Sequence, residues 1–178
     1  AIECPSRTMR MGCVVSLISL TLEDATDKET QPGGTRWHAS LVTYSIPEHP
    51  LPDWLAELVS PLDDKLSVKV REISPNRCVV TAPLDGNTQP MGLWHGGGSG
   101  VLVETAGSLA AIAHARTFKH SAVGIELSVS HLRPPHGHQV IATATAVHLG
   151  KRTTTHTVEI VDDEGRICAI GRMTCQVV

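Results

Sequence analysis

The sequence predicts an α+β domain in which an antiparallel sheet is covered on one face by a single long helix. Three observations support this fold class. From residue 51 onward, the predicted elements follow the order short helix, two strands, long helix, four strands. The segments between the strands are rich in Pro, Gly, Asn and Asp, the residues that form turns. The long helix contains no proline, and one such helix on an antiparallel sheet gives a two-layer domain.

Each predicted element carries a local signal. Pro52 and Asp53 are start signals for a short helix, because Leu55, Leu58 and Val59 follow them at helical spacing and form an apolar face. A Pro-Asn pair at residues 75–76 joins two alternating segments into a hairpin. The predicted strands cover residues 66–74, 77–84, 121–132, 139–149, 152–161 and 166–177, and the predicted long helix covers residues 99–115 after a turn-rich loop over residues 85–98.

The long helix is unusually rich in small residues. A glycine inside a helix costs about 1 kcal/mol relative to alanine, so Gly107 indicates a tight packing contact that outweighs helix propensity. Small side chains let a curved sheet approach the helix closely, so that the sheet can wrap around it. The small residues are Gly100, Ala106, Gly107, Ser108, Ala110, Ala111 and Ala113.

Composition excludes several classes of protein. The chain has 178 residues and a formal net charge of -3, which gives no long-range field to attract nucleic acid or an anionic membrane. Its cysteines are odd in number, scattered and never arranged as CxxC, which argues against a disulfide framework and a zinc knuckle. We therefore expect a cytoplasmic protein without nucleic-acid or membrane partners.

Residues 1–50 differ from the rest of the chain, and we treat them as an N-terminal extension of unknown role before a domain over residues 51–178. Their apolar run at residues 13–22 is too short to span a bilayer. A signal peptide is the alternative, but no small-x-small cleavage site follows the run, so a strand is favoured.

The segment most informative about chemistry is QPMGLWHGGGSGVLVETAGS at residues 89–108. Its glycines are not a phosphate loop, because no Gly-Lys-Ser/Thr follows, and the spacing does not fit a dinucleotide fingerprint. What remains is a glycine-rich loop leading into a helix N-terminus. Free backbone N–H groups and the helix dipole favour an oxygen that acquires negative charge there, so the segment predicts an oxyanion site.

Four polar side chains are candidates for chemistry in or near this segment. Glu104 lies within an apolar part of the predicted helix, where a carboxylate is costly to bury, and Ser108 falls on the same face one turn later. The alternative is that both mark the solvent face of the helix. His131 ends an apolar row on its strand, where a packed core histidine is the alternative. Arg133 follows where the strand leaves the sheet. It would be placed there to meet an anionic group, and the alternative is an ordinary surface arginine.

Together these residues resemble the PaaI-type hotdog thioesterases, which include phenylacetyl-CoA and para-hydroxybenzoyl-CoA thioesterases and the proofreading thioesterase of enterobactin synthesis. The resemblance covers residues 51–178 and implies a hotdog fold, in which an antiparallel sheet wraps around one long central helix. The motifs that carry it are QPMGLWHGG at residues 89–97, ETAGS at 104–108, EL at 126–127, HLRP at 131–134 and VHLGKR at 147–152.

The resemblance implies a thioesterase that hydrolyses acyl-CoA or acyl-carrier thioesters and needs no cofactor or metal. The Gly96 N–H and the Gln89 amide would polarise the thioester carbonyl. Glu104 would act as general base on water or as direct nucleophile. Three further positions, His95, Ser108 and His131, would orient substrate or water.

The resemblance also implies that two subunits share each active site, with Glu104 from one chain facing Gln89 and Gly96 of the other. Relatives usually pair such homodimers into tetramers, and a threonine-rich strand at residues 153–157 is suitable surface for a second dimer or for solvent. The candidates for substrate and CoA contacts are Gly97, Arg133, Lys151 and Arg152. Cations beside turns suit phosphate, although Lys151 and Arg152 also fit ordinary solvated surface.

Two other functions stay open at this stage. A hydratase or dehydratase can share the fold, although the glutamate eight residues after Gly96 favours hydrolysis. A non-catalytic acyl-CoA-binding module is the second alternative. A metal site is disfavoured, because His136 and His138 lie in a Pro/Gly turn without cysteines or acids at ligand spacing.

Overall fold

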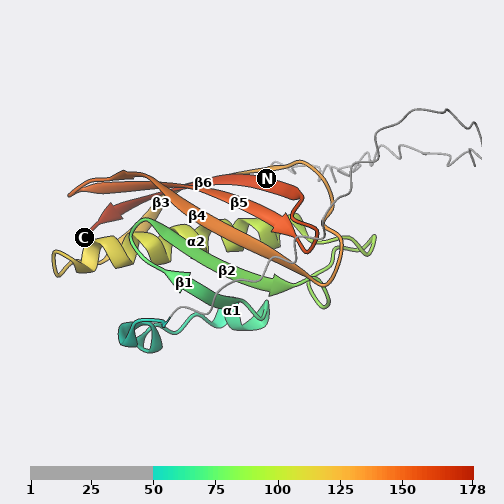
Figure 1. Cartoon of the computed structure of the whole chain (residues 1–178), viewed down its shortest axis with the longest axis horizontal. Coiled ribbons are helices and arrows are strands. Elements are labelled where there is room, and N and C mark those ends of the chain that lie inside the picture. The colour runs from blue at the N-terminus through green and yellow to red at the C-terminus, as the bar shows by residue number, and fades with distance from the viewer. Residues whose placement is uncertain (1–49) are drawn as a thin grey trace, which may run out of the picture. The chain divides into compact units, whose positions relative to one another are not determined.

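The computed structural model describes residues 50–178, and the predictions for residues 1–49 lie outside this part of the chain. The order of helices and strands is as predicted (Figure 1). The helical elements are a 3₁₀ turn η1 (Asp53–Glu57), α1 (Pro61–Lys65) and the long α2 (Gly96–Arg116), and the strands are β1 (Lys69–Ile73), β2 (Arg77–Pro83), β3 (Ala122–His131), β4 (Gln139–Leu149), β5 (Thr153–Asp162) and β6 (Ile167–Val177).

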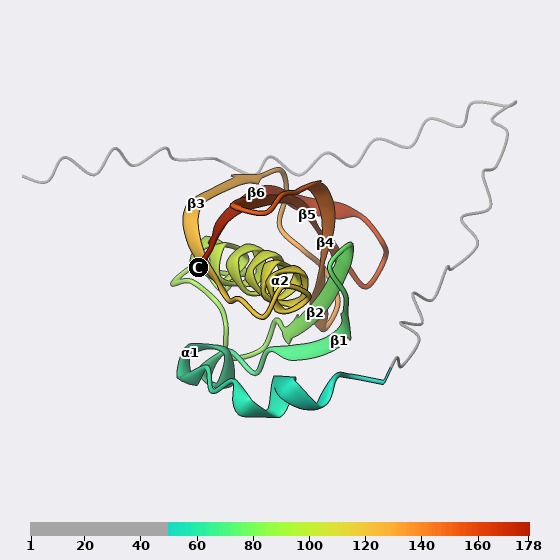
Figure 2. The same cartoon turned by 90° about the vertical axis from the view of Figure 1, so that its left-hand side faces the viewer.

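The six strands form one antiparallel sheet in the order β1-β2-β4-β5-β6-β3. The sheet curves around α2, which Figure 2 shows nearly end-on at the centre of the wrapped strands. In the same view, α1 lies on the side of α2 that the sheet leaves uncovered. This arrangement confirms the predicted hotdog fold. It leaves β1 and β3 as the two edges of the sheet.

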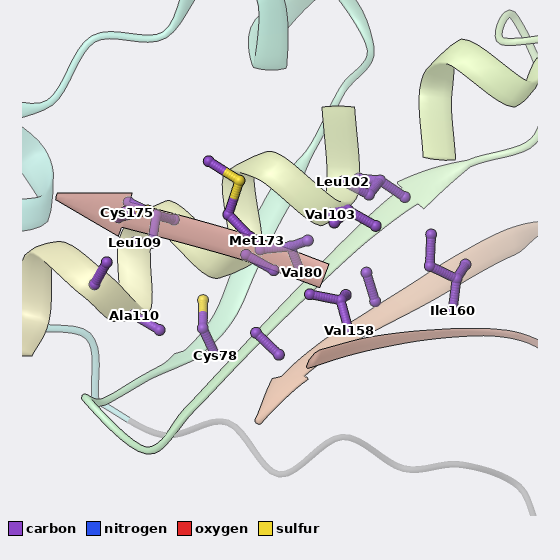
Figure 3. Packing of buried hydrophobic residues seen from close by; sticks show 14 of the residues in the cluster. Cys78, Val80, Leu102, Val103, Leu109, Ala110, Val158, Ile160, Met173 and Cys175 are labelled. Carbon is purple, nitrogen blue, oxygen red and sulfur yellow. The ribbon is translucent and has the colours of Figure 1, made fainter. Parts of the chain in front are cut away.

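The small residues of α2 allow the sheet to come close, as predicted. A Cβ atom added to Gly107 would overlap the Met173 side chain of β6, so only glycine fits at this crossing. Met173 is itself buried and packs in the main apolar cluster with residues such as Leu102 and Val158 (Figure 3). The core is therefore filled because the sheet comes close to α2, and larger side chains on the helix are not needed for this.

The helix α2 starts three residues earlier than predicted, at Gly96 instead of Ser99. His95 is its N-cap: its Nδ1 atom accepts a hydrogen bond from the Gly97 N–H at 2.8 Å. The run of glycines has low helix propensity, but this cap satisfies one of the free N–H groups of the first turn. The glycines therefore belong to the helix start, which places the predicted oxyanion donors at its first turn.

The predicted N-terminal helix is wrong in extent. It is divided into η1 and α1, because the chain is extended at Leu58 and a new helix begins at Pro61. Val59, predicted on the apolar face, is 82% exposed. Strand β1 is also shorter than predicted, since residues 66–67 form the turn after α1.

Strand β2 does not alternate as predicted, because all five residues from Cys78 to Ala82 are buried. One face packs on α2, and on the other face Arg71 donates from its Nε atom to Thr81 Oγ1 at 3.3 Å. The three cysteines of residues 50–178, Cys78, Cys168 and Cys175, are free and buried. In the same part of the chain, no helix has the length and apolar character needed to cross a membrane.

Candidate functional site

The loop before α2 is held in a defined shape by its own hydrogen bonds. Asn87 donates from its side chain to the Leu66 and Pro83 carbonyls, both at 3.0 Å, and its own carbonyl accepts the His95 N–H. Gly92 adopts a positive φ of 79° at the tip, a conformation that favours glycine. The loop therefore delivers the start of α2 in a fixed position.

Gln89 is oriented within this loop. Its side-chain oxygen accepts the Met91 N–H at 2.7 Å, and its backbone N–H donates to the Leu93 carbonyl at 2.7 Å. Since the oxygen is occupied locally, the NH₂ group of the side chain is the part left to donate to a ligand. The carbonyl oxygen of a ligand accepts hydrogen bonds, so it requires a donor such as this NH₂ group.

Gln89 and Gly96 line the same cleft, which we call the Gly96 cleft and which has a volume of about 310 Å³. Within residues 50–178, the Gly96 N–H has no hydrogen-bond partner, as expected for the first residue of a helix. A Cβ atom at Gly96 would lie 3.1 Å from the His131 ring, so glycine lets this ring approach. The other residues that line the cleft are Leu93, Trp94, Leu132, Arg133, Pro134 and Pro135.

His131 does not belong to the core, which answers one of the alternatives left open by the sequence. Its side chain is exposed, and its Nε2 atom lies 3.2 Å from the Gly96 carbonyl oxygen. The ring therefore contacts the backbone at the helix start. His95, by contrast, uses Nδ1 to cap the helix, which leaves its Nε2 atom for other contacts.

Glu104 lies in a second hollow, the Glu104 cleft, with a volume of about 260 Å³. The carboxylate is exposed in the single chain, and one of its oxygens would lie 3.9 Å from a Cβ built on Gly124 of the edge strand β3. Ser108 shares the cleft, as the helical spacing predicted. The other lining residues are Leu58, Ser60, Leu62, Asp63, Val101, Thr105, Leu109 and Ile112.

The floor and outer wall of the Glu104 cleft are tied to the fold. The Ser108 hydroxyl lies 3.8 Å from the Cys175 thiol, whose pKa is raised by burial, and α1 is held against α2 by a 2.7 Å hydrogen bond from Thr105 Oγ1 to Asp63. Sequence reasoning missed the contribution of Leu58, Leu62 and Ile112 to this cleft. Ile112 could have been found, because it follows Ser108 by one helical turn.

The two clefts share no lining residue. Gly96 and Glu104 are eight residues apart on one helix, which separates them by about 12 Å along its axis. A single thioester carbonyl is too small to contact both groups at once. One chain therefore places the Gly96 N–H and the Glu104 carboxylate in separate clefts, which we call the two half-sites.

Both half-sites lie beside β3, one of the two edge strands of the sheet. Glu104 is next to Gly124 near the beginning of this strand, and the Gly96 cleft is next to His131 at its end. Between them, Ile125 is 55% and Leu127 is 43% exposed. An edge strand with apolar side chains and free backbone groups is a surface suited to pairing with another strand.

The cations predicted to bind CoA phosphates lie at opposite ends of α2. Arg133 lines the Gly96 cleft. Lys151 and Arg152 follow Gly150, whose carbonyl oxygen is 3.0 Å from the ring of His114 at the end of the helix. A 21-residue helix is about 30 Å long, so these two residues do not share a cleft with Gly96 of the same chain.

Comparison with known proteins gives a consistent family. A model of the thioesterase superfamily matches residues 91–169. The proofreading thioesterase EntH of Cronobacter turicensis is 34% identical over 123 residues, covering 68% of this chain and 89% of that protein. The 1,4-dihydroxy-2-naphthoyl-CoA hydrolase of Escherichia coli is 34% identical over 110 residues, covering 61% and 80%.

A solved structure agrees with these matches. PaaI, a phenylacetic acid degradation protein of Thermus thermophilus whose structure was solved for a mutant form, superimposes with a TM-score of 0.60 at 28% identity, covering 67% of this chain and all of that one. The resemblance seen in the sequence motifs is thereby confirmed. The chain belongs to the thioesterase superfamily, in its PaaI-like group with the hotdog fold.

Proposed function

We propose that this protein hydrolyses acyl-CoA thioesters to a free acid and CoA, at sites shared by the two subunits of a homodimer. The observation that carries the proposal is the separation of the two half-sites. The backbone donors of the Gly96 cleft and the carboxylate of the Glu104 cleft lie at opposite ends of one unpaired edge strand.

Antiparallel pairing of β3 with its copy would complete both sites. If the two-fold axis passes between Leu127 and Ser128, Gly124 of one chain lies opposite His131 of the partner subunit. Glu104, beside Gly124, would then face Gly96 of the partner subunit. The same pairing would bury the exposed Ile125 and Leu127 side chains and satisfy the free backbone groups of the edge.

The chemistry follows from this arrangement. The thioester oxygen would accept hydrogen bonds from the Gly96 N–H and the Gln89 amide, which stabilise the negative charge that develops there. As general base, Glu104 would take a proton from water while the water oxygen bonds to the carbonyl carbon. The carbon–sulfur bond then breaks, and the thiolate recovers the proton from Glu104. Direct attack by the carboxylate would instead break the carbon–sulfur bond, release the thiolate and form a mixed anhydride with Glu104. Water would then hydrolyse the anhydride to the free acid and the Glu104 carboxylate, and the thiolate would take up the proton that this water releases.

The neighbouring side chains support this step. Ser108 lies in the cleft of Glu104 and would hold the water or the carboxylate. His131, in contact with the Gly96 carbonyl, would keep the helix start in place, and His95 Nε2 would be free to contact the substrate. The aliphatic side chains of Leu58, Leu62 and Ile112 would receive the acyl group.

Further contacts follow from the family. Arg133 lines the Gly96 cleft, whereas Gly97 lines a separate hollow together with His95; both would contact the CoA part of the substrate. Lys151 and Arg152 would serve the same purpose only if the partner subunit brings them near. The threonines on the outer face of β5 would provide the contact between two dimers.

The first test is a free-thiol assay with aryl, short-chain and long-chain acyl-CoAs. Wild-type protein should release CoA, and Glu104→Gln should lower kcat by about 10³-fold with an unchanged thermal unfolding curve. Hydration of an unsaturated acyl-CoA without thiol release would instead identify a hydratase. Tight binding without either reaction would identify a non-catalytic module.

The second test asks whether the site is shared. Glu104→Gln and Gln89→Ala chains, mixed under conditions that exchange subunits, should form heterodimers with one intact site. A 1:1 mixture should recover about one quarter of wild-type activity, because half of the dimers are heterodimers and half of their sites are intact. A mixture no more active than the mean of the two variants contradicts a shared site.

A further inference from the structure

A third hollow lies apart from both half-sites, on the face of the sheet that points away from α2. We call it the basic pocket. Thr81 alternates along β2 with Val80 and Ala82, which pack on α2, so Thr81 points to the opposite face. The pocket has a volume of about 260 Å³ and is lined by Ser67, Lys69, Arg71, Thr81, Ala82, Pro83, His138 and Gln139.

Within residues 50–178, no carboxylate forms an ion pair with the basic side chains that line this pocket. Three of its side chains are basic and none is a carboxylate. Among residues 50–178, the ion pairs with Asp or Glu use other arginines, and Glu72, the acid on the same strand as Lys69 and Arg71, is paired with Arg77 at 3.0 Å. Lys69 and Arg71 thus form a local positive site on a chain whose net charge is -3.

The pocket is also organised for an anion before one arrives. The Arg71 Nε atom donates to Thr81 Oγ1, and Thr81 is only 3% exposed. This contact fixes the guanidinium group and leaves its two terminal nitrogens to donate. A fixed guanidinium, a lysine and two hydroxyl groups are the donors that hold a phosphate through charge-assisted hydrogen bonds.

The basic pocket is connected to the Gly96 cleft by one loop. Residues 132–135 of this loop line the cleft, and His138 at its other end lines the pocket. The loop is fixed there by two hydrogen bonds: the His138 carbonyl accepts the Leu84 N–H at 2.8 Å, and the His138 N–H donates to Asp163 at 2.6 Å. The same loop therefore borders both hollows.

We infer that the basic pocket binds a phosphate group of the nucleotide part of a CoA thioester. This assignment of the ligand rests on the proposed function, because CoA carries its thioester at one end of a flexible arm and its phosphates at the other. Lys69, Arg71 and His138 then add a phosphate contact on the same chain that provides Gly96. The donors Lys151 and Arg152, at the far end of α2, are not needed for it.

Equilibrium binding tests the pocket without any turnover. Adenosine 3′,5′-bisphosphate is titrated calorimetrically into the full chain at low salt. Arg71→Met and Lys69→Met should each raise its Kd about tenfold, because each removes a charged donor and keeps much of the apolar stem. Lys65→Met is the matched control: it removes the same charge on α1 outside the pocket, and its Kd should equal that of wild type. Equal Kd values for wild type and Arg71→Met overturn the proposal.

Inorganic phosphate, titrated in the same way, distinguishes the source of the phosphate. A Kd at least tenfold weaker than that of the bisphosphate supports a nucleotide site. If inorganic phosphate binds as tightly as the bisphosphate, the pocket is a site for free phosphate and the CoA assignment is wrong. Raising the salt concentration should weaken both ligands, since the pocket acts through charge.

Kinetics separate this proposal from the proposed function. With an acyl-CoA, Arg71→Met should raise KM about tenfold at unchanged kcat. With the corresponding N-acetylcysteamine thioester, which carries no phosphate, kcat/KM should stay at the wild-type value; an equal loss with both substrates shows a structural effect and overturns the proposal. If wild type releases no thiol but binds the bisphosphate through Arg71, thioester hydrolysis fails and the phosphate pocket stands. If wild type releases thiol and Arg71→Met has a normal KM, thioester hydrolysis stands and the phosphate pocket is wrong.

Discussion

The two ends of α2 both carry histidines and use them in different ways. At its start, the exposed rings of His95 and His131 contact the first turn beside an open cleft. At its end, His114 and His156 are buried, and their Nε2 atoms bond to the carbonyl oxygens of two turns. One end keeps backbone N–H groups free for a ligand, whereas the other closes the core. The same residue type is therefore exposed beside a cleft at one end and buried in the core at the other.

The largest expected effect would come from removing one N–H at the open end. Gly96→Pro deletes this donor, and proline is tolerated at the first position of a helix. The preceding His95 has φ -74° and ψ 123°, a conformation that suits a residue before proline. We expect thioester hydrolysis to fall by about 10² to 10³-fold in kcat, measured by thiol release.

Gly96→Ala is the matched control, because it adds a Cβ atom but keeps the N–H group. The new atom would lie 3.1 Å from the His131 ring, which is exposed and can shift. We expect Gly96→Ala to retain most of the activity that Gly96→Pro loses. If both variants lost the same activity, the absence of a side chain at Gly96, rather than its N–H group, would be what the site requires.

A smaller effect, on stability, is expected at a carboxylate near the open end. Asp162 is fully buried and accepts hydrogen bonds from the Arg166 side chain and from the His136 N–H, which ties the loop of the Gly96 cleft to the turn after β5. Burial raises the pKa of Asp162, but these hydrogen bonds outweigh it and hold the pKa at about 2. The carboxylate therefore stabilises the fold above its ordinary pKa, and this stabilisation is lost as pH falls toward 2.

Asp162→Asn should accordingly lower the free energy of unfolding by about 2 kcal/mol at pH 7, and by much less near pH 2. Urea unfolding at the two pH values measures this difference. Glu164→Gln removes the other acid paired with Arg166 but does not touch the loop, so it should have little effect at either pH. If Asp162→Asn lowered the free energy of unfolding equally at both pH values, the charge of Asp162 would not be the cause of the loss.

The smallest effect is expected at the closed end, in the pH dependence of stability. Burial lowers the pKa of His156, and its Nδ1 atom has no partner among residues 50–178. The unfolded chain therefore binds a proton more readily than the folded one, so stability declines as pH falls below the ordinary histidine pKa of about 6.5. His156→Gln should flatten this decline between pH 7.5 and 5 in urea unfolding. His131→Gln, at the exposed end, should leave the decline unchanged; identical slopes for wild type and His156→Gln would contradict the assignment.

Much of the fold could be predicted because its signals are local. Turn residues separated the strands, and Gly107 indicated the contact that Met173 provides. The start of α2 was missed because glycine has low helix propensity, while the cap from His95 is a contact that propensity does not contain. The break before Pro61 was missed because leucine spacing alone does not reveal that Val59 faces solvent.

The sequence placed several of the candidate residues in the right neighbourhoods but did not give the geometry of the clefts. Gln89, Gly96 and His131 do share one cleft, and Glu104 and Ser108 share another. Which histidines are buried could not be predicted: His131 ends an apolar row but is exposed, whereas His156 lies in a threonine-rich strand but is buried. The elements that cover each ring decide its burial, and the strand pattern does not contain them. The wall that α1 builds beside Glu104 depends on tertiary packing, so sequence periodicity did not reveal it.

The two edge strands of the curved sheet, β1 and β3, differ in how well they can pair with a strand of another chain. β1 carries Lys69, Arg71 and Glu72, and a bulge between Val70 and Glu72 interrupts its regular ladder. Strand β3 also has an irregularity, between Gly124 and Glu126, but Glu126 is paired with Arg172 and apolar side chains lie on either side of it. The charges of β1 therefore discourage a further strand from adding, whereas the more apolar edge of β3 is suited to pairing. If two chains paired through β3, neither described domain would have a free apolar edge strand. The outer edges of the joined sheet would be the two copies of β1, whose charges oppose further pairing. Association by this route would be self-limiting at two copies and could not propagate into a polymer.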